Sequence, residues 1–315
     1  MIRRLYLFAV YTTLLLLCIH LQVLADSLSD AKIAYDLGHY DESIRLLTIV
    51  AEQGNADAQC GIAIMYEHGR GVSQDYNKAI EWYRKAASQG NAVAENNLGY
   101  LYYIGYGVNQ DYKQAFEWYN TAAENVNARN WVKSMALCNL GNMYFNGQGV
   151  VRNYSKAKEY YQKASDRNNP FAQNNLGFIY EHGLGVKRDY NQAMLLYRKA
   201  AEKGNAFAEQ NLAVMCETGR GIMQKYDEAF QWYSKSALQG SPFAQYKLGR
   251  IYERGLGVNK DLIEAYKWYV LASAHGDKPA EENLKRLQTI MTTSQIDEAK
   301  QRAKSFVPKV LEYHE

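Results

Sequence analysis

Proline is scarce in this sequence, with 4 residues among 315, and charge of one sign is nearly balanced by the other. Together with 23 glycines, 27 tyrosines and abundant alanine, this scarcity favours short helices of small and aromatic residues over strands bounded by proline turns. The formal net charge of +3 is too small to indicate a nucleic-acid partner, and no basic run with interleaved aromatic residues occurs. We therefore expect no nucleic acid among the partners.

Cysteine is also scarce, and its number argues against a disulfide-stapled domain. Of the 4 cysteines, Cys18 falls within an N-terminal hydrophobic segment, which leaves Cys60, Cys138 and Cys216. An odd number does not make a complete disulfide framework in an exported protein.

The one long uncharged run lies at the N-terminus. Arg3 and Arg4 precede a leucine-rich stretch over 5–24, and the small-residue pattern ending at Ala25 suits cleavage before Asp26. This layout predicts a signal peptide over 1–25, so that the mature protein has no stable membrane span and is secreted or periplasmic after cleavage near Ala25. The alternatives are a membrane anchor formed by residues 5–24, or the endoplasmic-reticulum lumen for a eukaryotic source.

An internal repeat dominates the rest of the chain. A glycine turn of the form G-x-G-[VI] begins at Gly69 and recurs with spacings of 36, 42, 36, 36 and 36 residues. Each unit contains two segments with the three-and-four spacing of a buried helix face. The paired turn glycines are Gly69 and Gly71, Gly105 and Gly107, Gly147 and Gly149, Gly183 and Gly185, Gly219 and Gly221, and Gly255 and Gly257. The repeat predicts an all-α protein in which an antiparallel helix pair occurs six times over 55–276.

A glycine turn beside an acidic residue would also fit a phosphate-binding loop. Six copies cannot each be the one phosphate loop of an enzyme, and Gln74 stands where the third glycine of G-x-G-x-x-G would be. The turn has a structural explanation instead, since Gly69 can end a helix in the left-handed conformation and Gly71 permits the reversal. No cofactor is therefore predicted.

The start of the second helix in each unit should be capped by its own sequence. Asp75, Asp111 and Asp189 put a carboxylate at the positive end of that helix, and Asn153 is a fair substitute. Lys225 occupies the same position in the fifth unit and cannot cap. The second helix of that unit should have the weakest start.

Small residues recur at one place in the first helix of each unit. They are Ala63, Gly99, Gly141, Gly177, Ala213 and Gly249. Because glycine inside a helix costs about 1 kcal/mol relative to alanine, its repetition there indicates a close approach between the two helices. A bulky residue at Gly177 should separate the pair.

The ends of the array differ from the units between them. Residues 26–54 predict a shorter, tetratricopeptide-like helix pair that turns at Gly38-His39 without the glycine insertion. Residues 277–306 predict C-terminal capping helices, with a capping box formed by Ser294 and Asp297, followed by a tail over 307–315.

The consensus A-x-x-x-L-G-x-x-Y-x-x-G-x-G-V-x-x-D-Y-x-x-A-x-x-W-Y-x-x-A-A is nearly complete from Ala94 to Ala123. With this pattern the chain resembles the Sel-one-like repeat family, a branch of the tetratricopeptide-type helical solenoids. The resemblance implies a right-handed α-α solenoid of stacked helix pairs that binds other proteins. It also implies an exported or endoplasmic-reticulum setting.

Candidate chemistry in the sequence is weak. His68 and His182 lie three units apart and should not converge on one metal, and Cys60 and Cys138 lie two units apart, beyond disulfide reach. We expect independent buried or half-buried thiols, no metal and no catalytic residues. Some relatives are associated with β-lactam binding or hydrolysis, and this alternative rests on two S-x-x-K matches, at Ser29–Lys32 and Ser155–Lys158. Neither S-D-N nor K-T-G accompanies them.

A six-residue surplus precedes the third unit, around 124–133. The simpler interpretation is a tolerated extension of an exposed loop. The functional alternative makes Trp131, flanked by Arg129 and Lys133, an anchor for a partner, because tryptophan and arginine are enriched at interface hot spots.

Taken together, the repeats predict a non-enzymatic, monomeric scaffold or adaptor. Stacked units create an extended surface, on which variable first-helix positions would bind a protein or peptide partner. The function classes left open are a regulator of envelope enzymes, a host-interaction factor, a structural component of an envelope complex and a β-lactam-active enzyme.

Overall fold

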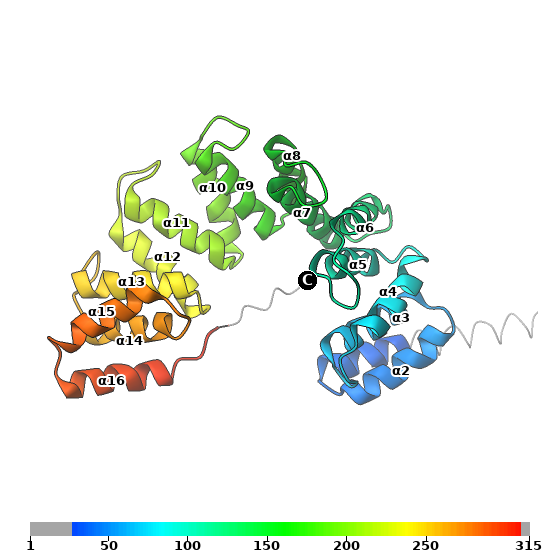
Figure 1. Cartoon of the computed structure of the whole chain (residues 1–315), viewed down its shortest axis with the longest axis horizontal. Helices are drawn as coiled ribbons and strands as arrows, with labels where there is room; N and C mark the ends of the chain where they lie inside the picture. The colour runs from blue at the N-terminus through cyan, green and yellow to red at the C-terminus, as the bar shows by residue number, and fades with distance from the viewer. Residues whose placement is uncertain (1–26, 310–315) are drawn as a thin grey trace, which may run out of the picture. The chain divides into compact units, whose positions relative to one another are not determined.

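The computed structural model describes residues 27–309 and divides the chain into two compact units between Arg152 and Asn153. Each unit is all-α, with no strand among its described residues, and adjacent helices pack as pairs (Figure 1). The prediction of an all-α solenoid of helix pairs is confirmed. The predicted signal peptide over 1–25 and the last residues of the tail lie outside the described range.

The N-terminal unit begins with helical residues 27–36 and continues with regular helix pairs. Its helices are α2 (Tyr40–Glu52), α3 (Ala56–His68), α4 (Tyr76–Ala87), α5 (Ala92–Ile104), α6 (Tyr112–Glu124) and α7 (Asn130–Asn146). Within it, α3 packs against α4, and α5 packs against α6.

The C-terminal unit begins with the second helix of the third repeat. Its helices are α8 (Tyr154–Ser165), α9 (Pro170–His182), α10 (Tyr190–Glu202), α11 (Ala206–Thr218), α12 (Tyr226–Leu238), α13 (Pro242–Arg254), α14 (Leu262–Ser273), α15 (Lys278–Gln288) and α16 (Thr293–Lys304). The pairs α9 with α10, α11 with α12 and α13 with α14 repeat the packing of the first unit. None of the helices between residues 27 and 309 is both long and apolar enough to cross a membrane.

Both turn glycines are required by the backbone. The first one caps the preceding helix in the left-handed conformation in every repeat, for example Gly69 at φ 66° and Gly105 at φ 80°. The second also has a positive φ, and a Cβ on Gly107 would lie 2.8 Å from the Tyr76 carbonyl carbon of the preceding repeat. The second glycine therefore permits repeats to stack, a role in addition to the chain reversal predicted from the sequence.

Capping of the second helices follows the sequence prediction. Oδ1 of Asp75 accepts hydrogen bonds from the amides of Asn77 and Lys78 at 3.0 and 3.1 Å. Asp111, Asp189 and Asn153 also cap their helices through side-chain oxygens. Lys225 at the start of α12 makes no such bond, so the uncapped start in the fifth repeat is confirmed.

A buried tyrosine of the second helix explains the small residues of the first. A Cβ on Gly177 would lie 2.8 Å from Cε1 of Tyr197, and one on Gly99 would lie 2.7 Å from Cδ1 of Tyr119. Both tyrosines are buried in the helix pair. The predicted close approach is thus confirmed, and its cause is an aromatic ring seated against the glycine.

Two helices, α15 and α16, follow the last repeat, but the predicted capping box at Ser294 and Asp297 is wrong. The box is formed by Thr292 and Gln295, because Thr292 is the last extended residue before α16 and Ser294 is already helical. The Gln295 amide donates to Thr292 Oγ1 at 3.3 Å, and the Thr292 amide donates to the Gln295 side chain at 3.0 Å. At the other end, Gly38 turns the first pair with φ 79°, as predicted.

Candidate functional site

Three phenylalanines form an exposed column on the first helices of the C-terminal unit. Phe171, Phe207 and Phe243 are each the second residue of α9, α11 and α13, and they are 44%, 64% and 38% exposed. The next residue in each helix is a fully buried alanine. The same position therefore holds an outward-facing aromatic ring in three successive repeats, and we call these three residues the phenylalanine column.

The surface beside the column changes along the unit. On α9, Phe178 lies two turns after Phe171 and stacks on His182 with ring centroids 4.0 Å apart. On α11, the Asn211 amide donates to Asn174 Oδ1 of α9 at 2.9 Å. On α13, the matching positions are basic, including Arg250 and the exposed Arg254. The face is apolar at one end and basic at the other.

A half-buried carboxylate lies beneath this face and holds one of its basic residues. Lys247 Nζ lies 2.7 Å from Glu217 Oε2, and the Tyr233 hydroxyl donates to the same carboxylate at 2.7 Å. Burial acts to raise the pKa of Glu217, but the bonds from Lys247 and Tyr233 and the charge of Arg250 outweigh burial and hold the pKa below its usual value. Glu217 is therefore ionised and fixes Lys247 in place.

The six additional residues before the third repeat form more than a loop. Helix α7 begins at Asn130 and has 17 residues, compared with 13 in α5, so four of the six extend the helix by one turn. Val132 in this turn is 1% exposed, which shows that the turn is packed onto the unit. The expectation of a simple loop extension is corrected accordingly.

The candidate anchor residues lie at this added turn but do not form one patch. Arg129 precedes α7 and is exposed, while Trp131 and Lys133 are half-buried. Residues four apart share a helix face and residues two apart do not, so Arg129 and Lys133 lie on one side and Trp131 on another. Trp131 is less accessible than the sequence interpretation assumed.

The candidate histidines and Ser155 are exposed residues of repeat helices. His68 and His182 are exposed final residues of α3 and α9. Ser155 is an exposed residue at the start of α8, and the Lys158 amine lies 5.9 Å from the Tyr180 ring centroid. Across residues 27–309, no group of three histidine, cysteine, aspartate or glutamate side chains has the arrangement to hold a metal ion.

The three cysteines are free and buried, as expected. Burial raises the pKa of Cys60 and Cys138 to about 12 and that of Cys216 to about 11. A thiol that stays protonated at neutral pH is a poor nucleophile. These cysteines are part of the packing of α3, α7 and α11.

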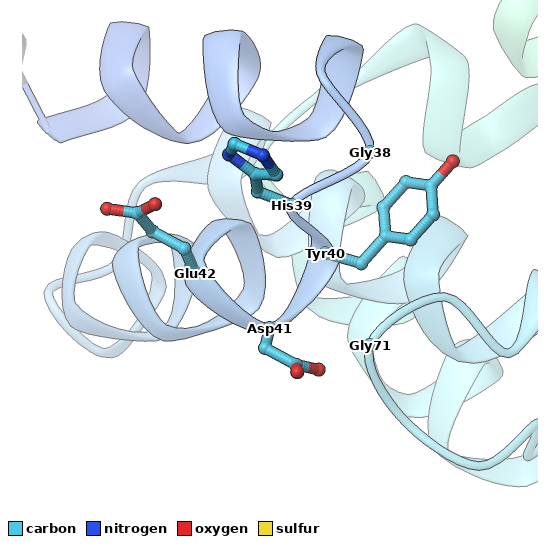
Figure 2. Close-up of a pocket in the computed structure, with 6 residues that line it drawn as sticks. All are labelled: Gly38, His39, Tyr40, Asp41, Glu42 and Gly71. Carbon is cyan, nitrogen blue, oxygen red and sulfur yellow. The ribbon is translucent and has the colours of Figure 1, made fainter.

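A depression of about 380 Å³ lies where the first helix pair meets the first glycine turn. Figure 2 shows His39, Tyr40, Asp41 and Glu42 around it, with the two carboxylates directed away from each other. Acidic residues in the first turn of α2 stabilise the helix through its dipole. The divergent side chains do not form a site for acid–base chemistry.

Sequence reasoning did not identify the phenylalanine column, although its signal is present. The aligned first helices begin with N-P-F-A, N-A-F-A and S-P-F-A. Read alone, each phenylalanine looks like a core residue. In the structure, the alanine that follows each phenylalanine is buried, and the phenylalanine ring points outward.

Comparison with known proteins supports the repeat assignment directly. The Sel1 repeat pattern matches residues 56–91, 92–127, 134–169, 170–205, 206–241 and 242–277. Among solved structures, a Sel1 repeat protein from Oxalobacter formigenes is 33% identical with a TM-score of 0.73, covering 79% of this chain and 99% of that one. A search of curated proteins gave no match.

Two further solved structures are similar at lower scores. The protective antigen c5321 of uropathogenic Escherichia coli, described as displaying an SLR fold, is 26% identical with a TM-score of 0.47, covering 85% of this chain and 72% of that one. The immunity protein Pa5087 of Pseudomonas aeruginosa is 23% identical with a TM-score of 0.48, covering 71% and 83%. Both TM-scores are too low to support an inference about function. Six matched repeats and the 33% identical structure establish that the chain belongs to the Sel1 repeat family.

Proposed function

We propose that this protein is an exported, non-enzymatic scaffold that binds a protein or peptide partner across the phenylalanine column. Sel1 repeat proteins generally bind proteins, and the leader-like sequence over 1–25 supports export to a secreted or periplasmic location. The scaffold would act as a regulator of envelope enzymes or in host interaction, by docking rather than by chemistry.

The observation that carries this proposal is the repeated exposure of one residue type. Single exposed apolar residues are common, but exposed rings at equivalent positions of successive repeats, as in the phenylalanine column, mark an interaction surface. Covering the exposed part of each ring would contribute about 1 kcal/mol to the free energy of binding. Three rings would therefore supply a substantial part of the binding free energy of a micromolar complex. Lys247, which is held by Glu217 and lies 5.4 Å from the Phe243 ring centroid, and Arg250 on the same helix would favour a partner with acidic residues near that end.

The test is site-specific photo-crosslinking in the native compartment. A photoreactive phenylalanine analogue at position 207 should crosslink a partner that mass spectrometry identifies. The same analogue at Leu195, which is 49% exposed on second helix α10, serves as the matched control. The triple change of Phe171, Phe207 and Phe243 to serine should abolish capture, with an unchanged circular dichroism spectrum. Equal crosslinking from both positions would contradict the proposal.

The added turn of α7 is a second proposed contact. Arg129 and Lys133 on one side of the turn, or Trp131 on the other, would contact a partner at this turn. Because Trp131 is half-buried, Trp131→Ala should lower both partner binding and thermal stability, whereas the change of Arg129 and Lys133 to serine should affect binding alone. Unchanged binding in both variants would leave the turn as a packing element.

A further inference from the structure

Residues 306–309, the last that the structure describes, fold back onto the second helices of the last two repeats. The Phe306 ring meets Trp268 edge-on with centroids 5.6 Å apart, and the Lys309 amide donates to the Leu238 carbonyl at 2.8 Å. Pro308 covers Gly240: a Cβ added to Gly240 would lie 3.5 Å from the Cβ of Pro308. We call Phe306, Val307, Pro308 and Lys309 the tail segment.

The positions around the tail segment have equivalents in the N-terminal unit, where both tryptophans and the glycine are the same residues. Trp82, Ser88, Gly90, Trp118 and Thr121 on α4, α6 and the loop after α4 occupy the repeat positions of Trp232, Leu238, Gly240, Trp268 and Leu271. The equivalence extends to side-chain geometry. The Lys85 amine lies 4.0 Å from the Trp82 ring centroid, and the Lys235 amine lies 4.2 Å from that of Trp232.

The two sets differ in what covers them. Trp232 and Trp268 are 8% and 5% exposed, whereas Trp82 and Trp118 are only half-buried. Ser88 and Gly90 are exposed, while Leu238 and Gly240 are partly covered. A Cβ on Gly90 would meet nothing within 4 Å, where one on Gly240 would meet Pro308.

The equivalent surface of the N-terminal unit is therefore less covered, because the described residues place no counterpart of the tail segment there. Trp118 offers its ring to an aromatic side chain, the exposed Ser88 leaves its carbonyl accessible to a backbone amide, and Gly90 leaves room for a proline. Thr121 replaces Leu271 and makes the surface less apolar. Such a surface suits a segment that binds and leaves rather than one that is permanently docked.

We propose that this surface, formed by Trp82, Ser88, Gly90, Trp118 and Thr121, binds an extended segment of a partner protein with the chemistry of the tail segment. That chemistry is an aromatic residue, an aliphatic residue, a proline and then a free backbone amide. The tail segment of the same chain stays on α12 and α14, because tethering gives it a high effective concentration there. This second-helix surface is separate from the phenylalanine column, so the inference does not rest on the proposed function.

The probe is a fluorescein-labelled peptide with the sequence of residues 301–309, QRAKSFVPK, titrated with the full chain and followed by fluorescence anisotropy. We expect saturable one-to-one binding with a dissociation constant below about 1 mM. Thr121→Arg places a charged, bulky side chain at an exposed position and should weaken binding at least about tenfold without unfolding the protein. Thr121→Leu introduces the residue type found at the equivalent position, Leu271, and should tighten binding by a factor of about three or more.

A probe peptide with alanine in place of phenylalanine is the ligand-side control and should bind at least about tenfold more weakly. The serine triple variant of the phenylalanine column should bind the probe normally, which separates failure of this proposal from failure of the proposed function. Absence of binding at about 1 mM, or binding that survives Thr121→Arg, overturns the proposal. Concentration-dependent dimerisation that is lost when the chain ends at Ser305 would also overturn it, in favour of a second copy as the occupant.

Discussion

The hydroxyl of Tyr197 donates a hydrogen bond to Oε2 of Glu181, 2.8 Å away in the facing helix of the same pair. Both residues are buried, and Arg220 of the next repeat lies 2.9 Å from the other carboxylate oxygen. The arrangement recurs at Tyr233 with Glu217 and at Tyr269 with Glu253. The tyrosine thus joins two helices of one repeat, and the cation joins that repeat to the next.

Loss of this hydroxyl should destabilise the C-terminal unit. Tyr197→Phe keeps the ring against Gly177 but leaves a buried carboxylate oxygen without its donor, at a cost of about 1 to 2 kcal/mol. Urea unfolding followed by circular dichroism measures the change. Tyr100→Phe, at a tyrosine that is 47% exposed, is the control and should change stability by less than about 0.5 kcal/mol. Equal effects would mean that the buried bond contributes nothing.

The stability of the protein should depend on pH through Glu209. Burial raises the pKa of Glu209 to about 7 from an ordinary value of 4.5, and the charge of Lys235 and the bond from Gln239 offset only part of that rise. Between these two values the unfolded chain has lost a proton that the folded protein keeps, so the contribution of Glu209 to the free energy of unfolding falls as pH rises. Above about pH 7 the folded protein also carries the buried charge, and the loss is complete.

Glu209→Gln should remove this dependence. Glutamine stands at the equivalent position in other repeats, as Gln59, Gln173 and Gln245, so the substitution fits the fold. We expect a gain of about 1 to 3 kcal/mol at pH 8 and little change at pH 4, measured by urea unfolding at both values. A gain of the same size at both pH values would show that packing, not ionisation, is responsible.

The second turn glycine should be far less replaceable than other glycines with positive φ. Gly107→Ala places a methyl group 2.8 Å from the Tyr76 backbone, in addition to the strain of φ 70°. Gly38→Ala has a similar φ of 79° with nothing within 4 Å, and it should cost about 1 kcal/mol. The Gly107 variant should cost at least about 2 kcal/mol more, because the stacked repeats must move apart. Thermal denaturation of the two variants tests the difference, and similar midpoints would rule out the stacking role.

The uncapped start of α12 offers a stabilising substitution. Lys225→Asn supplies the side-chain oxygen that Asn153 provides in α8, without adding negative charge beside Asp227 and Glu228. We expect a gain of about 0.5 to 1 kcal/mol in the free energy of unfolding, less the small contribution of the exposed pair between Lys225 and Glu228. Lys225→Ala loses the same pair without adding a cap, and it should not stabilise. A gain in the alanine variant would assign the effect to charge.

Features at positions that can be compared between aligned units could be predicted from the sequence. The helix pairs, the left-handed cap at Gly69 and the missing cap at Lys225 follow from local rules applied to aligned repeats. The close approach at Gly177 was also predictable, because the cost of glycine in a helix needs a compensating contact.

Features that the aligned repeats do not fix were not predictable in the same way. The docking of Phe306 on Trp268 joins distant parts of the sequence, and no periodicity records it. The capping box was misplaced by two residues because both Ser294 and Thr292 are good caps, and only the backbone decides between them. The outward direction of Phe207 depends on which face α10 and α12 cover, which a single first helix does not reveal.

The second turn glycine also affects how the repeat array can evolve. At Gly107 and Gly149 the close contact is with the backbone at the start of the preceding second helix, so the joint needs little more than a tyrosine there. After a unit is duplicated or deleted, the units that become neighbours would therefore already fit each other. The length of the array can evolve by whole units, while the residues on its faces diversify to suit new partners.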